Sequence, residues 1–184
     1  MVLFGAASTA RADDDPRGWH AWRPRIDIEP AAWFLHGYSV HVGVQPPAFP
    51  RVLLSTGAYA FDMPAMLVTM TGEDPDAWDG RLRVGAGVFA DVFVGTHVDR
   101  GWVVGGQLGV QRYEVVDRAT MARQQFECAL LLLRGGYEWH PRGIGGYVFP
   151  WVGAAITPEV AGDRGAYDPR PVVPYVTLDL GWRF

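Results

Sequence analysis

Two groups of residues in this sequence could support chemistry: a serine–histidine pair and a set of charged residues. Ser39 and His41 are separated by one residue, so a β-strand would place the hydroxyl and the imidazole on the same face. A base close to a serine is the minimum for nucleophilic catalysis. The sequence assigns no acidic third residue, and two polar residues on the wet face of a strand fit the same spacing. The pair is therefore a weak catalytic candidate, and the sequence favours a protein that is not an enzyme.

The charged residues occupy alternate positions within otherwise apolar segments. Alternate positions share one face of a strand, so these side chains are expected to gather on one wall of a folded sheet. The predicted lumen network consists of five arginines and five acids: Arg25, Asp27, Glu29, Arg81, Arg83, Asp91, Arg134, Glu138, Asp179 and Arg183. Buried charges are tolerated when they are paired and hydrogen-bonded, so the favoured role is a salt-bridge plug. A gated pore or a substrate slot is the alternative.

The elements that must position these residues are segments with two-residue periodicity. Eight of them are separated by clusters of Pro, Gly and Asp, and none keeps a helical period over three turns. They cover residues 24–34, 38–46, 50–61, 80–94, 101–116, 123–139, 144–157 and 171–184. Long and short connections alternate between them, except at the first, as in barrels with long outer loops and short periplasmic turns. The sequence therefore predicts an all-β fold, an eight-stranded antiparallel up-and-down transmembrane β-barrel over residues 24–184.

The last segment gives the clearest indication of lipid outside this barrel. Its apolar residues share one face and alternate with Thr177, Asp179, Gly181 and Arg183: they are Val176, Leu178, Leu180, Trp182 and Phe184. An aromatic girdle at the periplasmic ends is predicted from Trp102, Tyr137, Trp139 and Tyr147. A soluble lipocalin-like barrel would alternate as well, with its apolar face turned inward around a ligand. The charged second face favours the membrane version.

The alternating aromatic end Leu180-Gly181-Trp182-Arg183-Phe184 resembles that of small eight-stranded outer-membrane barrels. These include the transmembrane domain of outer membrane protein A, outer membrane protein W and the lipid A-modifying barrels. The resemblance covers nearly the whole mature chain as architecture and implies a Gram-negative outer membrane. The protein is expected to be a monomer. The terminal phenylalanine pattern resembles the signal that the barrel assembly machinery reads. Lipid A deacylases carry His-x-Ser with a glutamate, facing lipid; Ser39-x-His41 reverses that order, so no catalytic role carries over.

Composition excludes several other classes. The 184 residues suit one domain, and no apolar stretch is long enough for a transmembrane helix. A net charge of -4 gives no reason to expect nucleic acid, and one cysteine, Cys128, cannot form an intrachain disulfide. No metal or cofactor is expected, because these histidines lack ligand spacing: His20, His36, His97 and His140. Residues 1–12, with Ala10-x-Ala12, are expected to be a signal-peptide remnant or a short disordered tail, and residues 13–23 a periplasmic segment.

Two surface features bear on partners. Residues 63–70 are unusually apolar for an outer loop and are interpreted as a loop that folds its methionines against the rim, with a short helix over the mouth, a segment dipping into lipid, or a cover for a hydrophobic ligand as alternatives. Five arginines are expected near the outer surface, where guanidinium groups suit lipopolysaccharide phosphates: Arg112, Arg118, Arg123, Arg164 and Arg170. The sequence thus predicts a structural or surface-interaction role. A lipid-modifying enzyme and a transporter of small hydrophobic molecules are the alternatives.

Overall fold

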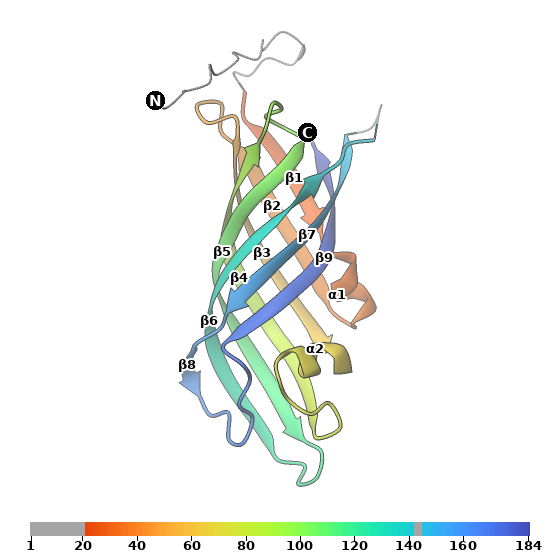
Figure 1. Cartoon of the computed structure of the whole chain (residues 1–184), viewed down its shortest axis with the longest axis vertical. Helices are drawn as coiled ribbons and strands as arrows, with labels where there is room; N and C mark the ends of the chain where they lie inside the picture. Colours follow the sequence, from red (N-terminus) through yellow and green to blue (C-terminus); the bar gives the residue numbers. More distant parts are fainter. Residues whose placement is uncertain (1–20, 142–144) are drawn as a thin grey trace, which may run out of the picture.

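The computed structural model describes residues 21–141 and 145–184. Two short helices interrupt a fold that consists mainly of strands (Figure 1). The helices are α1 (Pro30–Phe34) and α2 (Ala65–Met70). The strands are β1 (Arg23–Ile28), β2 (Tyr38–Gln45), β3 (Val52–Met63), β4 (Trp78–Val94), β5 (Gly101–Asp117), β6 (Arg123–Glu138), β7 (Gly146–Ile156), β8 (Glu159–Gly162) and β9 (Val172–Arg183). Across these described residues, no helix is long and apolar enough to span a membrane.

Eight of the nine strands close into a ring. Each strand from β1 to β6 pairs antiparallel with the next one in the chain, and β9 pairs with both β7 and β1. The short β8 adds to β6 where β7 has ended. The predicted all-β fold with eight antiparallel strands in up-and-down order is therefore confirmed. Seven of the eight segments lie within two residues of their predicted bounds.

The two ends of the ring differ. The near end carries the beginning of β1, the end of β9, the connections β2–β3 and β4–β5, the end of β6 and the beginning of β7. The far end carries α2, β8 and the β5–β6 connection, with β4, β5 and β6 extending well towards it (Figure 1). A short helix, one of the alternatives for residues 63–70, is present there as α2. The predicted signal remnant at residues 1–12, and all but the last residues of the segment 13–23, lie outside the described residues.

One β-bulge changes which residues of β4 face inward. The register with β3 and with β5 shifts at the same place, next to Arg83, so β4 carries one extra residue there. Leu82 is consequently buried inside the ring, whereas Arg81 and Arg83 are exposed. The sequence prediction placed both arginines inside, because it assumed uninterrupted alternation from residue 80 to residue 94, and such alternation would turn Leu82 outward. The bulge reverses the inner and outer faces only for the residues of β4 that precede it.

The first strand is shorter than predicted. β1 ends at Ile28, and α1 begins at Pro30, although the segment was predicted to continue to residue 34. Proline has no backbone N–H for a strand ladder, and its fixed φ suits the first position of a helix. Because β1 ends early, its last pair with β9 is Ile28–Leu180. β2 begins at Tyr38, so the last pair of β2 with β3 in this direction is Tyr38–Ala60. The facing edges of β3 and β9 beyond those pairs form what we call the side gap, and α1 lies beside it (Figure 1).

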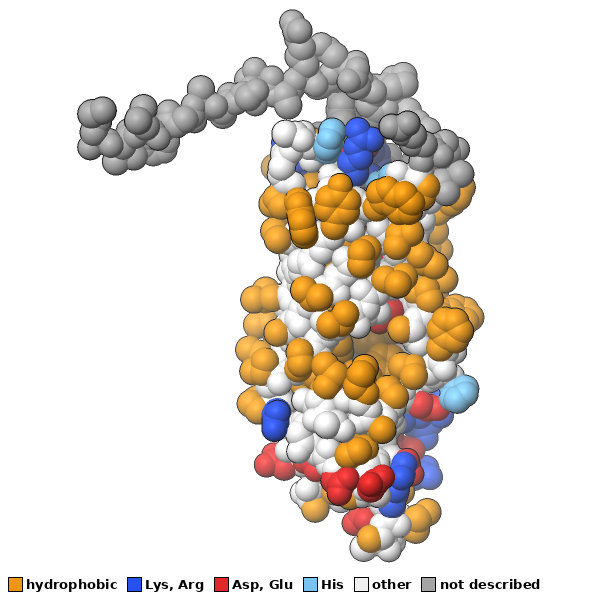
Figure 2. Space-filling model, turned by 45° about the vertical axis from the view of Figure 1, so that its right-hand side comes forward, with side chains coloured by type: hydrophobic (Ala, Val, Ile, Leu, Met, Phe, Trp, Pro, Cys, Tyr) orange, Lys and Arg blue, Asp and Glu red, His pale blue; other side chains and the backbone are white. Residues whose placement is uncertain are grey.

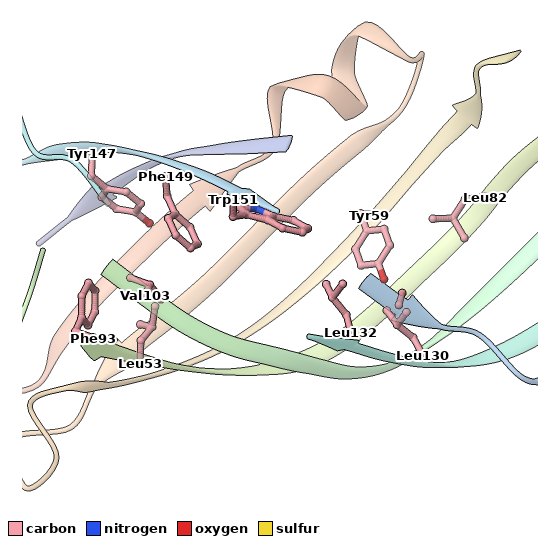
Figure 3. Close-up of a cluster of buried hydrophobic side chains, with 11 residues drawn as sticks. Leu53, Tyr59, Leu82, Phe93, Val103, Leu130, Leu132, Tyr147, Phe149 and Trp151 are labelled. Carbon is pink, nitrogen blue, oxygen red and sulfur yellow. The ribbon is translucent and has the colours of Figure 1, made fainter. Parts of the chain in front are cut away.

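The interior divides into two parts along the axis. Aromatic side chains of β7 project from one wall towards Leu53, Phe93 and Val103 on the other (Figure 3). Charged groups lie among these rings in the near half of the ring. A second apolar cluster lies at the far end, between the strands and the loops that carry α2 and β8: Val68, Trp78, Val115, Phe126, Cys128 and Tyr167. The core of the molecule is therefore the inside of the ring, polar at one end and apolar at the other.

Candidate functional site

Most of the predicted lumen charges lie inside the ring. Six are buried, namely Arg25, Asp27, Asp91, Arg134, Glu138 and Asp179. The side chain of Arg183 is 11% exposed, and Glu29, which follows β1 and caps α1, is partly buried. They come from β1, β4, β6 and β9, so the closed ring brings together residues that are far apart in the sequence. We call this set, without Arg81 and Arg83, the interior charge network.

Glu138 is the centre of the network at the near end. Its carboxylate accepts a hydrogen bond from Arg25 Nη1 at 2.9 Å, another from Arg183 Nη2, and lies 2.7 Å from His140 Nε2. Arg25 also donates from Nε to Asp27 at 3.1 Å, and Asp27 accepts a second bond from the Tyr147 hydroxyl at 2.9 Å. Each charge therefore has an opposite charge within bonding distance, as a buried charge requires.

Arg134 is the centre of a second cluster nearer the middle of the ring. It forms a bidentate pair with Asp91, with Nε–Oδ1 and Nη2–Oδ2 distances of 3.1 and 2.7 Å. Its remaining nitrogen, Nη1, lies 3.6 Å from Asp179, which also accepts a bond from the Trp151 indole at 3.2 Å. Parallel N–H···O bonds of this kind are among the strongest that side chains form. This arginine therefore neutralises carboxylates from two strands, β4 and β9.

Aromatic rings pack against both guanidinium clusters. The Arg25 guanidinium lies 4.1 Å from the centre of the Tyr147 ring, and that of Arg134 lies 4.8 Å from the centre of Phe89. Tyr147 was predicted in the outer girdle, but it is 2% exposed and faces inward, so that prediction is wrong. The reason is that both faces of β7 are apolar, which leaves periodicity no means of choosing the inner one. Gly181 on β9 provides the room, since a Cβ there would lie 2.0 Å from the Tyr147 ring.

Arg81 and Arg83 do not belong to the network. Both lie on the outside of β4, where Arg81 pairs with Asp62 at 3.2 Å and Arg83 with Glu114 at 2.7 Å. Without them the network holds three arginines and all five of the predicted acids. The acids are Asp27, Glu29, Asp91, Glu138 and Asp179. The interior therefore carries an excess of carboxylates rather than the balance that the sequence predicted.

Two histidines touch this excess of acid. His41 Nδ1 lies 3.6 Å from Asp27 Oδ1, and His140 Nε2 lies 2.7 Å from Glu138 Oε1. The sequence analysis considered His41 only as a base for Ser39 and His140 only as an unlikely metal ligand. The sequence did contain a signal for these contacts with acids. His41 lies on the inner face of β2, and His140 follows the inward-facing Glu138 by two residues.

Ser39 and His41 lie on the inner face of β2, as their spacing predicted, and both are buried. Asp27 supplies the acidic neighbour that the sequence could not assign. However, Ser39 Oγ and His41 Nε2 have no hydrogen-bond partner, so the hydroxyl is not bonded to the base that would activate it. The imidazole instead packs edge-on against Phe89, with ring centres 5.0 Å apart. This arrangement orients a histidine but does not form a working nucleophile.

The position of His41 depends on a glycine opposite to it. A Cβ on Gly57 would lie 1.8 Å from His41 Cδ2, so a Gly57→Ala variant must displace the imidazole. We expect a loss of about 1–3 kcal/mol in the free energy of unfolding, as in other overpacked interiors. Urea unfolding followed by tryptophan fluorescence would measure it. Gly135→Ala is the matched control, because its Cβ would meet only atoms at 3.6 and 3.8 Å. Equal losses in both variants would contradict a specific packing of His41 against Gly57.

The outer surface carries the remaining predicted sites. Trp102, Tyr137 and Trp139 are exposed at the near end, where the Trp102 and Tyr137 rings meet edge-on at 5.4 Å. The apolar residues predicted on the outer face of the last segment all point outward: Val176, Leu178, Leu180, Trp182 and Phe184. Four of the far-end arginines pair with acids: Arg112 with Glu127, Arg118 with Asp79, Arg123 with Glu114, and Arg164 with Glu159. For Arg170 the structure gives a backbone bond to Thr71.

Two comparisons complete the description of the site. Within residues 21–141 and 145–184, no three His, Cys, Asp or Glu side chains are grouped as ligands of a metal ion would be. The chain matches no protein-family model, and a search of the curated proteins finds no match either. The functional argument consequently rests on the geometry and chemistry of this chain's own residues.

Proposed function

We propose that the chain is a transmembrane β-barrel of a bacterial outer membrane, with a lumen closed by its own side chains. Its role is structural or in surface interaction, and the near end faces the periplasm. The observation that carries this proposal is the inversion of polarity between the two sides of the wall. Large apolar side chains cover the outside, while charged residues lie inside, as in barrels surrounded by lipid.

The outer wall supports this proposal in composition. Exposed apolar residues occur on every strand of the ring, and many are more than half exposed: Val42, Val88, Leu108, Val110, Leu133, Val152 and Val176 are examples. Figure 2 shows hydrophobic side chains over most of the wall, with most of the acidic ones gathered near the far end. A water-soluble protein rarely exposes a continuous apolar surface of this kind.

The height of the apolar wall also supports a membrane. On β5 the outward positions between Trp102 and Arg112 carry Val104, Gly106, Leu108 and Val110. Ten residues at about 3.3 Å each, tilted by roughly 40°, correspond to about 25 Å along the axis, which matches the apolar band of outer-membrane barrels. The aromatic side chains at one border and the ion pairs at the other fit the two interfaces of such a band.

The interior argues for a closed lumen. Paired arginines, carboxylates and aromatic rings fill the near half, and the interior of an eight-stranded barrel is only just wide enough for side chains. A structural role therefore suits the site better than conduction of ions. Contact with lipopolysaccharide is proposed for the far end, where phosphates would compete with Glu127 and Asp79 for Arg112 and Arg118.

Cell fractionation and gel mobility test the proposal. Expressed with a secretion signal in a Gram-negative host, the protein should enter the outer-membrane fraction. An unboiled sample should migrate faster than a boiled one, because a closed barrel resists unfolding by detergent. A soluble protein without a mobility shift would contradict the proposal and favour a lipocalin-like barrel.

A further inference from the structure

Three buried polar atoms on the inner face of β2 and β9 are not used by the ion pairs of the interior charge network. Ser39 Oγ, His41 Nε2 and Asp179 Oδ1 have no hydrogen-bond partner among the described residues. Their residues are 0%, 6% and 1% exposed, respectively. Buried polar atoms nearly always have a partner, so three unpaired ones on neighbouring parts of the wall indicate a place where a polar ligand binds.

The strand register brings these atoms together around Glu29. This residue has an extended backbone, with φ and ψ of -102° and 103°, so it continues β1 before α1 begins. Continued past the end of β1, the β1–β2 register places Glu29 opposite Ser39, and the β1–β9 register places it opposite Asp179. Glu29 and Asp179 are also close enough to His41 to interact with it electrostatically. We call these four residues, Glu29, Ser39, His41 and Asp179, the acceptor patch.

The excess of acid in the interior is concentrated at the acceptor patch. Arg134 lies 3.6 Å from the other carboxylate oxygen of Asp179, Oδ2, and its two shorter bonds are made to Asp91. Glu29 forms no ion pair with any other residue that the structure describes. Because a buried carboxylate needs a counter-charge, the ligand that suits this patch is a cation.

Hydrogen-bonding chemistry narrows the class of cation. Carboxylate oxygens only accept hydrogen bonds, and a serine hydroxyl can accept them. In the tautomer that directs its Nδ1–H towards Asp27, 3.6 Å away, His41 presents a further acceptor at Nε2. A primary ammonium group matches such a set, since it carries a positive charge and three N–H donors. A metal ion suits it less, because within the described ranges no three His, Cys, Asp or Glu side chains are grouped as its ligands.

The space beside the patch limits the size of this cation. The interior of an eight-stranded barrel is only just wide enough for side chains. Two aromatic side chains already lie next to the patch: the Phe89 ring packs against His41, and the Trp151 indole donates to Asp179 Oδ2. The ligand is therefore an ammonium ion with a small substituent.

The acceptor patch lies next to the side gap and near the polar border of the wall. Glu29 is the residue between β1 and α1, which lies beside the gap. Figure 2, which turns forward the side on which α1 and β9 lie in Figure 1, shows the wall hollowed at mid-height with an acidic side chain at the edge of the hollow. On β3, Tyr59 pairs with Ser39 and is three residues, or about 10 Å of strand, from the exposed Asp62. A small solute at that border is thus close to the patch.

We infer that the acceptor patch binds one small primary ammonium ion, which donates to Asp179 Oδ1, Ser39 Oγ and the Glu29 carboxylate. Its substituent, of one or two carbons, points towards the side gap. Methylammonium is the probe for this class. Tetramethylammonium has the same charge without an N–H donor, and sodium has the charge alone. The inference goes beyond the proposed function, since it requires the closed ring but not its location in a membrane.

Equilibrium dialysis measures this binding directly. Folded protein in uncharged detergent micelles, at neutral pH and low ionic strength, should bind radiolabelled methylammonium saturably, with one ion per chain. Unlabelled ammonium should displace it. Tetramethylammonium and sodium should be at least about tenfold less effective than ammonium, because neither can donate the charge-assisted hydrogen bonds that the patch accepts.

Three variants test the position of the site. Asp179→Asn should weaken methylammonium binding at least about tenfold, since it replaces an ionised acceptor by a neutral one. Ser39→Ala, which removes a neutral acceptor, should weaken it about threefold to tenfold. Asp79→Asn is the matched control: it makes the same change at a side chain that is 62% exposed, and binding should stay within about twofold. Each variant is first checked for the heat-dependent mobility shift, and Ser39→Ala remains the test if Asp179→Asn does not fold.

Three outcomes would overturn the inference. They are the absence of saturable binding to folded protein, displacement by tetramethylammonium or sodium as effective as that by ammonium, and equal effects of Asp179→Asn and Asp79→Asn. Because the mobility shift is recorded on the same samples, these outcomes are distinguishable from failure of the membrane proposal, in which the shift itself would be missing.

Discussion

An Arg134→Met variant is expected to lose about 3–5 kcal/mol of unfolding free energy, the cost of leaving buried charges without a partner. Arg134 holds Asp91 through two bonds and lies 3.6 Å from Asp179, and these carboxylates are 0% and 1% exposed. Methionine keeps most of the side-chain volume but leaves both acids unpaired. Urea unfolding in detergent micelles, followed by tryptophan fluorescence, would show the loss. Acidification should restore part of it, because protonated carboxyls no longer need a counter-charge.

Two comparisons separate the loss of charge pairing from a general effect of removing arginine. Arg112→Met removes an arginine whose pair with Glu127 is exposed, at 57% and 42%, so its cost should stay below about 1 kcal/mol. Arg134→Met combined with Asp91→Leu and Asp179→Leu should recover most of the stability, since apolar residues often replace a buried ion pair without loss. A cost for Arg134→Met no greater than that for Arg112→Met would show that the interior network does not hold the ring together.

The strand pattern was predictable because alternation is a local property of the chain. A strand such as β5 alternates without interruption, so its bounds and its inner face followed directly from the sequence. Pairing order also followed, because adjacent antiparallel strands need only short connections. The interior positions of Arg134 and Glu138 on β6 were recovered for the same reason.

The failures have equally local causes. A single extra residue at Arg83 reverses the inner and outer faces of the start of β4, and hydrophobicity gives no sign of it. On β7 both faces are apolar, so Tyr147 was placed in the girdle although it binds Asp27. Pro30 was visible in the sequence and could have ended β1 at Ile28. The contact between His41 and Asp27 joins two strands in a register that the sequence does not specify.

The second large effect concerns the outside of the wall. Leu108 lies on β5, six residues beyond Trp102, or about 15 Å along the axis at the rise and tilt used above, and thus close to the proposed bilayer midplane. A Leu108→Arg variant should therefore lose about 2–4 kcal/mol of unfolding free energy in phospholipid vesicles, the cost of an arginine at that depth. Reversible urea unfolding of the protein in vesicles provides the measurement.

Val160 gives a control with the same exposure as Leu108 at a different proposed depth. Both residues are apolar and 60% exposed, but Val160 lies on β8 at the far end, beyond the apolar band. Val160→Arg should cost no more than about 1 kcal/mol, since a charge near or outside the interface remains hydrated. If the two arginines cost the same, the middle of the wall faces water. In that case the apolar outer surface would have to be covered by protein rather than by lipid, and the side gap would open to solvent.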